Sequence, residues 1–241
     1  MLVSIIIPAR DEEDNIVATV TDMRQELTRR AVDYEIIVVN DNSRDATAQR
    51  VRHLALEDRH IILVENDPPA GFGRAVIKGL ERFSGDVAVI VMADASDDPR
   101  DIIRYRDQIR EGYDCCFGSR WQPDARVVGY PPFKWCLNRM GNKFLRCLFR
   151  VACDDISNAF KCYRREVIEN IMPLRAGDFS LTLELPLRAA MCGYRYSVIP
   201  VNWRARRKGA TKLKLKEMGS RYFKAILSLW LEKHRLQKTG T

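Results

Sequence analysis

Three groups of carboxylates each follow a short run of apolar residues. They are Asp11 and Glu12, then Asp41, then Asp94, Asp97 and Asp98. Carboxylate oxygens accept hydrogen bonds from ring N–H groups and hydroxyls, and they are ligands that Mg²⁺ and Mn²⁺ prefer. The third group crowds its carboxylates into a short stretch, where they would repel one another without a cation. These residue types predict a site for a polar ligand that is bound together with a divalent cation.

Strands and helices must position these groups. The apolar runs near residues 2–8, 34–40, 60–65, 87–93 and 114–118 read as strands, and amphipathic patterns predict helices at 15–29, 46–56, 74–83 and 101–111. This alternation predicts an α/β fold with a mostly parallel sheet that is flanked by helices. Because such sheets bind ligands beyond the carboxyl ends of their strands, we expect the three carboxylate groups to share one edge.

The second half of the chain predicts fewer strands. A helix is expected from Phe133 to Val151, a strand near 156–163, a helix at 181–191 and a strand at 196–203. The last helix, 215–236, has a broad apolar face and many basic residues. A chain of 241 residues with 46% hydrophobic content can bury one core, so we expect a single domain, 1–241.

Composition narrows the classes of partner. With 40 basic and 32 acidic residues the formal net charge is +8, which suits a nucleotide, a phospholipid surface or nucleic acid. Nucleic acid is not expected, because no aromatic residues are interleaved with the basic clusters. The seven cysteines contain no Cys-x-x-Cys pair, which argues against a zinc site or a disulfide framework. No signal pattern and no membrane-spanning run of ~20 residues is visible, so we expect a cytoplasmic location, at most peripheral to the cytoplasmic face of a membrane.

Five ordered motifs carry a family resemblance. They are Ile-Pro-Ala-Arg-Asp-Glu at 7–12, Val-Asn-Asp-Asn-Ser-Arg-Asp-Ala-Thr at 39–47, Gly-Ser-Arg at 118–120, Asp-Ile-Ser-Asn-Ala-Phe-Lys-Cys-Tyr-Arg at 155–164, and Arg-x-x-Gly-x-Thr-Lys at 206–212. Together they span most of the chain, and the sequence resembles the family 2 glycosyltransferases. Within that family it is similar to the branch of polyprenyl-phosphate (dolichol-phosphate) mannosyl- and glucosyltransferases.

The resemblance implies a Rossmann-like fold of the GT-A type. It also implies an inverting, metal-dependent transfer from a nucleotide-diphosphate sugar, a GDP- or UDP-sugar, to a polyprenyl phosphate. Residues of about 1–120 would then form the nucleotide-sugar half, about 121–211 the acceptor side, and about 212–241 an amphipathic helix.

The nucleotide-sugar positions implied by the resemblance follow the first two strands. They are Pro8, Ala9, Arg10, Asp11, Glu12, Val39, Asp41 and Asn42, together with Arg74 after the Gly71-Phe-Gly73 loop and Asp94. The alternative for Asp11 and Glu12 is that they cap the first helix. Arg74 is about equally well explained as a solvated arginine at a helix start.

The metal positions implied are Asp94 and Asp97, which would hold Mg²⁺ or Mn²⁺ against the diphosphate. The family usually writes this loop as Asp-x-Asp, and Ala-Asp-Ala-Ser-Asp-Asp at 93–98 departs from it. The alternative is that Asp97 or Asp98 begins the following helix.

The acceptor positions implied are Ser119, Arg120, Lys134 and Asn138, with Asp155, Asn158 and Lys161 on the next strand. Glu184 falls roughly where relatives with hydroxyl acceptors place a base, or it is a structural carboxylate. Arg206 and Lys212 belong to a basic loop that would counter the charge of the leaving diphosphate. Arg120, Glu184, Arg206 and Lys212, with Asp94, are therefore the expected catalytic residues.

Three other functions stay open at this point. The acceptor could be a sugar or alcohol hydroxyl, the chain could be a nucleotidyltransferase, or it could be a catalytically idle, membrane-associated binding subunit. The last helix either contacts a membrane peripherally or packs in the domain or in a homo-oligomer, because so broad an apolar face would not stay exposed.

Overall fold

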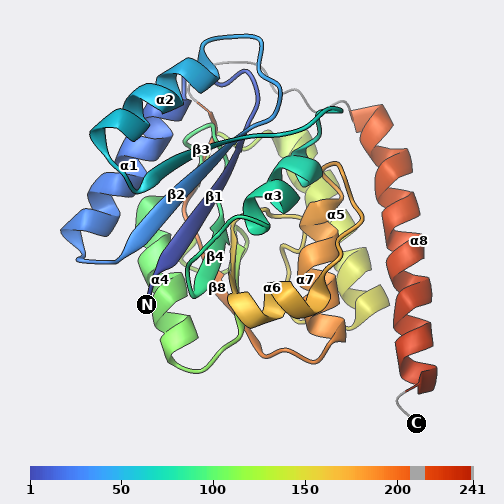
Figure 1. Ribbon diagram of the computed structural model, residues 1–241. Coiled ribbons are helices and arrows are strands. Elements are labelled where there is room, and N and C mark those ends of the chain that lie inside the picture. Colours follow the sequence, from blue (N-terminus) through green and yellow to red (C-terminus); the bar gives the residue numbers. More distant parts are fainter. Residues whose placement is uncertain (207–214, 240–241) are drawn as a thin grey trace.

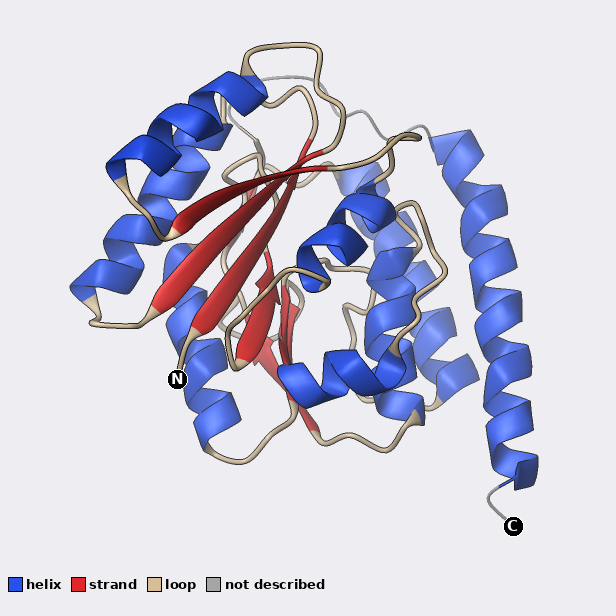
Figure 2. Ribbon diagram, viewed as in Figure 1, coloured by secondary structure: helices blue, strands red, loops and turns tan. Residues whose placement is uncertain are grey.

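The computed structural model describes residues 1–206 and 215–239. A seven-stranded sheet in the order β3-β2-β1-β4-β7-β5-β8 crosses the molecule (Figures 1 and 2). Its strands are β1 (Val3–Ala9), β2 (Tyr34–Asn40), β3 (Ile61–Glu65), β4 (Val87–Ile90), β5 (Cys115–Ser119), β7 (Lys161–Arg164) and β8 (Tyr196–Pro200). A second, small sheet pairs β6 (Val127–Val128) with β9 (Trp203–Arg204).

The large sheet is mostly parallel, as predicted. Only β7 is antiparallel to its neighbours β4 and β5. The strand expected near 156–163 begins only at Lys161, because the preceding residues form a turn. This turn lies beside the carboxyl end of β5, where it meets Gly118 through the Asn158 side chain.

Helices cover both faces of the sheet (Figure 1). They are α1 (Ile16–Arg29), α2 (Thr47–Glu57), α3 (Phe72–Leu80), α4 (Pro99–Arg110), α5 (Pro132–Phe149), α6 (Arg165–Ile171), α7 (Leu181–Met191) and α8 (Leu215–Thr239). Ile5 and Ile7 of β1 face a core with α1, α2 and α4, whereas Ile6 faces a core with α3, α5, α6 and α7. Alternate side chains of one strand therefore pack into two cores, one on each face of the sheet.

Helix α8 lies against α7, on the right of Figure 1. Its Leu229 is buried, while Phe223, Leu227 and Leu231 are exposed. The helix thus packs on the domain with one side only. Across the described part of the chain, no helix is both long and apolar enough to span a bilayer.

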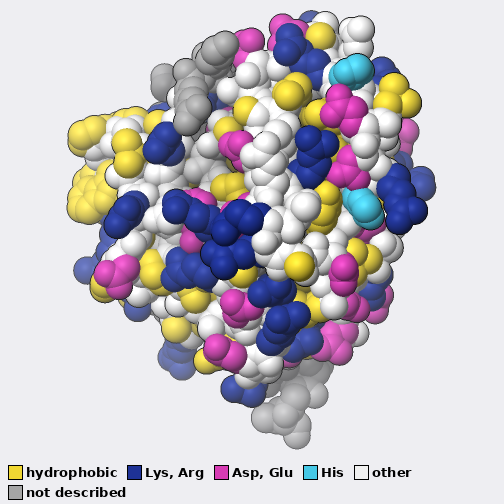
Figure 3. All heavy atoms as spheres, turned by 90° about the vertical axis from the view of Figure 1, so that its left-hand side faces the viewer, with side chains coloured by type: hydrophobic (Ala, Val, Ile, Leu, Met, Phe, Trp, Pro, Cys, Tyr) yellow, Lys and Arg dark blue, Asp and Glu magenta, His cyan; other side chains and the backbone are white. Residues whose placement is uncertain are grey.

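On the face shown in Figure 3, basic and acidic side chains are intermixed over most of the surface. Hydrophobic side chains form their largest group at the left-hand edge of that view.

Candidate functional site at the carboxyl edge of the sheet

The loops after β1 and β2 are joined into one wall. The backbone N–H of Asp41 donates to the carbonyl of Ala9 (2.8 Å), and Asp11 accepts a hydrogen bond from the backbone N–H of Arg44 (2.7 Å). Glu12 accepts one from the side chain of Asn15 (2.9 Å). Asp11 therefore joins the two loops, whereas the Glu12 side chain contacts the residue that precedes α1; both lie at the edge predicted from the sequence.

Asp41 links this wall to the loop before α3. Its buried carboxylate accepts hydrogen bonds from the Asn66 side chain (2.8 Å) and from the backbone N–H of Gly71 (3.0 Å). Asn42 donates to the carbonyl of Asn66 (3.2 Å). Pro8, Ala9 and Val39 are buried beneath, and Arg10 is exposed with its Nε 4.0 Å from Asp11.

Gly71 and Gly73 pack closely against the backbone of the segment that contains Ala176 and Gly177. A Cβ atom on Gly73 would collide with the carbonyl oxygen of Ala176, so only glycine fits there. Arg74 donates to the carbonyl of Pro69 (3.0 Å) and lies beside Gly177. In this structure Arg74 therefore fastens its own loop.

Asp94 lies at the end of β4, on the same edge. One carboxylate oxygen accepts the backbone N–H of Ser96 (3.2 Å), and the other lies 2.8 Å from Nη2 of Arg206. The Arg206 guanidinium also lies 3.6 Å from the Glu12 carboxylate. The structure thus brings together three expected site residues, Glu12, Asp94 and Arg206, from distant parts of the chain. Lys212 lies outside the described residues.

The neighbouring aspartates have local partners. Asp98 accepts the backbone N–H of Arg100 (3.0 Å) and caps α4, in agreement with the capping alternative. Asp97 is buried and accepts the backbone N–H of Met92 (2.9 Å). Burial raises the pKa of Asp97 to about 7, and this disfavours the charged form that a cation would bind.

The carboxylates of this edge make only a partial donor set for a divalent cation. Within residues 1–206 and 215–239, no group of three or more His, Cys, Asp or Glu side chains is arranged to hold a metal ion. Asp94 offers one hard carboxylate whose charge is already matched by a cationic side chain. This arrangement fits an ion that takes its remaining ligands from a bound diphosphate and water.

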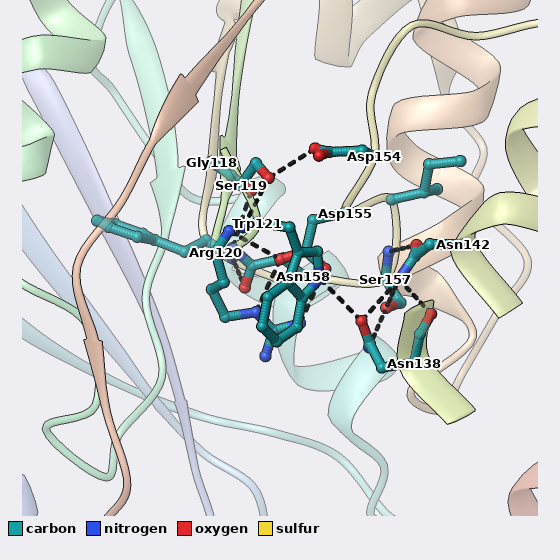
Figure 4. A network of polar contacts seen from close by, with 12 residues as sticks. Gly118, Ser119, Arg120, Trp121, Asn138, Asn142, Asp154, Asp155, Ser157 and Asn158 are labelled. Carbon is teal, nitrogen blue, oxygen red and sulfur yellow. Dashed lines mark hydrogen bonds and ion pairs between the residues drawn. The ribbon is translucent and has the colours of Figure 1, made fainter. Parts of the chain in front are cut away.

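A second cluster lies beyond the carboxyl end of β5 (Figure 4). Arg120 makes a two-point ion pair with the fully buried Asp155, at 2.8 and 2.9 Å, and its guanidinium lies over the rings of Trp121 and Tyr130. Burial lowers the pKa of Arg120, but the Asp155 carboxylate more than offsets this, so the net pKa is raised. The guanidinium is fixed in place and remains charged.

A chain of amides joins this cluster to α5 (Figure 4). Asn138 accepts from Nε1 of Trp121 (3.0 Å) and donates to Ser157 (3.0 Å), while Asn142 accepts the backbone N–H of Ser157 (3.1 Å). Ser119 donates to Asp154 (2.6 Å). Lys134, half-buried, lies one helical turn before Asn138. Asn138 therefore positions Trp121, a role that its residue type alone did not indicate.

Lys161 supports the turn that carries Asp155. It is fully buried, and its ammonium donates to the carbonyls of Ile156 (2.9 Å) and Asn158. Burial lowers the pKa of Lys161 to about 8. The sequence placed Lys161 on this strand without a role. Phe160 and Cys162 lie in the core with α1, α2 and α4, so Lys161 points to the other face of the sheet, and its residue type gave no sign that this face is also covered there.

Glu184 faces a loop of the protein. Its carboxylate accepts the backbone N–H groups of Arg175 (3.0 Å) and Ala176 (2.7 Å), and it pairs with Arg188 at 3.4 Å. It thereby holds the loop that packs on Gly73. This geometry favours the structural alternative over a general base.

An open α/β sheet with carboxylates beyond the carboxyl ends of its strands is typical of an enzyme that binds its ligand at that edge. The chain belongs to glycosyl transferase family 2, whose family model matches residues 4–172. The resemblance seen in the sequence is thereby confirmed.

Related sequences agree with this assignment. The chain is 30% identical over 216 residues to the polyprenol monophosphomannose synthase of Mycolicibacterium smegmatis, covering 87% of this chain and 80% of that protein. It is 31% identical to glycosyltransferase AglD of Haloferax volcanii, covering 88% of this chain, and 28% identical to a dolichol-phosphate mannosyltransferase of Pyrococcus furiosus, covering 89%. The chain spans only 34% and 60% of the lengths of these two relatives.

Solved structures confirm the GT-A fold. Glucosyl-3-phosphoglycerate synthase from Mycobacterium tuberculosis, in complex with Mn²⁺, UDP-glucose and phosphoglyceric acid, superposes with a TM-score of 0.70 over 95% of this chain and 79% of that one, at 18% identity. The same enzyme with Mg²⁺ and UDP gives a TM-score of 0.69, also at 18% identity, over 96% of this chain and 78% of that one. At this identity the likeness establishes the fold alone.

Proposed function

We propose that the protein transfers a sugar from a GDP- or UDP-sugar to a polyprenyl phosphate with inversion at the anomeric carbon, at the cytoplasmic face of a membrane. The observation that carries the proposal is the fixed ion pair between the largely buried Arg120 and the fully buried Asp155. A charged guanidinium held rigidly suits an acceptor that is already an anion. Relatives named for polyprenol- and dolichol-phosphate mannose transfer support the same acceptor class.

The donor would lie along the edge formed by the loops after β1, β2 and β4. Asp41 and the residues of the first loop would hold the nucleoside, and Asp94, with Asp97 in its ionised form, would hold Mg²⁺ or Mn²⁺. The bound cation would neutralise the developing charge of the diphosphate. Arg206 and Lys212 would add positive charge beside the leaving group.

The acceptor phosphate would lie against Arg120 and Lys134. A phosphate oxygen carries its negative charge at neutral pH, so the attack on the anomeric carbon requires orientation and no general base. This is consistent with a Glu184 carboxylate that is already occupied by two backbone N–H groups. A hydroxyl acceptor would instead need a free base within hydrogen-bond reach.

The test is a transfer assay with labelled GDP- and UDP-sugars, Mn²⁺, and a short-chain polyprenyl phosphate. The matched acceptor is the same alcohol without its phosphate. We expect product with the phosphate only, and loss of product in a chelator. Transfer to the alcohol but not to the phosphate would refute the acceptor assignment. Formation of a nucleotide sugar from a sugar phosphate and a nucleoside triphosphate, with release of pyrophosphate, would indicate a nucleotidyltransferase.

A further inference from the structure

The first half of α5 contacts the domain through hydrogen bonds and through the ring of Trp135, whose centroid lies 6.4 Å from that of Trp121. The buried residues of this helix are Asn142, Leu145 and Phe149, all in its second half. In the first half, Asn138 holds the helix to Trp121 and Ser157 by hydrogen bonds. Apart from Trp135, the apolar side chains of this half are not used to bind the helix to the domain.

Those side chains form one stripe that points away from the domain. Phe133, Leu137, Met140 and Phe144 are 70%, 43%, 65% and 57% exposed. At ~100° per residue their spacing places them within about 60° of arc, nearly opposite the face that contains Asn142 and Phe149. A contiguous exposed stripe of this kind marks an interaction surface.

The charges around the stripe identify its partner. Residues 132–149 contain four basic residues, Lys134, Arg139, Lys143 and Arg146, and no acidic residue. Lys134 and Lys143 lie on opposite flanks of the stripe by helical spacing. A helix with an apolar stripe between basic flanks lies in the interface of an anionic bilayer, where lysine stems reach up to the headgroups.

We propose that α5 docks the protein on an anionic membrane surface, with Phe133, Leu137, Met140 and Phe144 entering the interface. The proposal rests on the proposed lipid-phosphate acceptor and adds where the bilayer lies. The same helix holds Trp121 through Asn138, and Trp121 lies beside Arg120. Docking through α5 would bring a membrane-borne phosphate toward that guanidinium.

The experiment measures binding of the full chain to vesicles that contain no polyprenyl phosphate, so it is independent of sugar transfer. Vesicles of phosphatidylcholine are compared with vesicles that also contain phosphatidylglycerol. The α5 variant is Phe133→Ser/Met140→Ser. The control is Val17→Ser/Leu56→Ser, which changes exposed apolar residues on α1 and α2. A third variant, Phe223→Ser/Leu231→Ser, tests α8.

We expect the α5 variant to need at least about tenfold more anionic lipid for half-saturation, equivalent to ~1.4 kcal/mol, and the control to bind like the wild type. Because the substituted side chains are exposed, thermal unfolding should be unchanged in all variants. Unchanged vesicle binding in the α5 variant, or a loss confined to the α8 variant, would overturn the proposal. The proposal would also be overturned if the wild type does not bind vesicles but forms a dimer, and the α5 substitutions dissociate that dimer.

A spectroscopic measurement gives an independent readout. Cys136 is exposed on α5 with its sulfur 3.9 Å from that of Met140, whereas Cys192 is exposed at the end of α7. A polarity-sensitive dye on Cys136, with Cys147 and Cys192 replaced by serine, should shift to the blue on anionic vesicles. The same dye on Cys192, with Cys136 and Cys147 replaced, should not. A shift at Cys192 alone would place the membrane on another face.

Discussion

A guanidinium nitrogen of Arg206 lies 2.8 Å from a carboxylate oxygen of Asp94, which joins the end of β4 to a residue more than a hundred positions later in the chain. The same guanidinium lies 3.6 Å from Glu12, after β1. The positive charge of Arg206 thus lies between the carboxylates of Glu12 and Asp94. A diphosphate bound there with its cation would offer Arg206 a new anionic partner.

Asp94→Asn keeps the shape of the side chain and removes its charge. We expect the stabilisation of the protein by GDP or UDP to lose its dependence on Mn²⁺, as measured by thermal shift. For comparison, a ligand at 100 times its Kd adds about 2.7 kcal/mol. Asp98→Asn is the control, because asparagine caps a helix about as well as aspartate, so this variant should retain both the α4 cap and the Mn²⁺ effect. Full Mn²⁺ dependence in Asp94→Asn would move the metal ligand elsewhere.

Asp41→Ala removes a carboxylate that faces both the predicted nucleoside site and the loop before α3. We expect nucleotide affinity to fall by roughly 1.5–3 kcal/mol, the range for hydrogen bonds to charged groups, in a calorimetric titration. Asn66→Ala is the matched change, since it removes a partner of Asp41 in the loop contact. Wild-type affinity in Asp41→Ala would leave this residue with a structural role only.

Arg120→Lys and Glu184→Gln separate the two kinds of acceptor. Lysine keeps the positive charge at 120 but loses the two-point pair with Asp155, so transfer to the lipid phosphate should drop at least about tenfold, ~1.4 kcal/mol, with donor binding unchanged. Glu184→Gln should keep most activity and lose thermal stability. The opposite pattern, abolished transfer in Glu184→Gln at normal stability, would establish a base.

Lys161→Met tests the buried lysine through its pH dependence. The folded-state pKa of about 8 lies below the ordinary value of 10.5, so the folded state releases this proton first. The contribution of Lys161 to stability is therefore largest above pH 10.5 and is lost as the pH falls toward 8. We expect the free energy of unfolding of the wild type, relative to Lys161→Met, to increase by about 1–3 kcal/mol across that interval. A difference that stays constant in denaturant titrations would show that Lys161 does not titrate there.

The amino-acid sequence determined the strands, most of the helices and the edge of the sheet. Buried strands have short apolar runs and surface helices have apolar residues three and four apart, so local pattern is enough to locate β1, β2 and α1. Parallel strands end on one side, and this rule alone groups Glu12, Asp41 and Asp94 at one edge. The family motifs added roles to positions that the pattern had already grouped.

Tertiary structure decided which polar groups already have partners and which apolar groups lack them. Asp98 caps α4 and Glu184 holds a loop because backbone N–H groups reach them in the folded chain, and the apolar pattern of the sequence does not record those approaches. Helix α5 has apolar residues on more than one side, so its spacing did not tell which of them the core covers. Only packing shows that Leu145 is buried and Phe133 is exposed. Burial depends on neighbours that are distant in the chain, and the sequence alone does not place those neighbours.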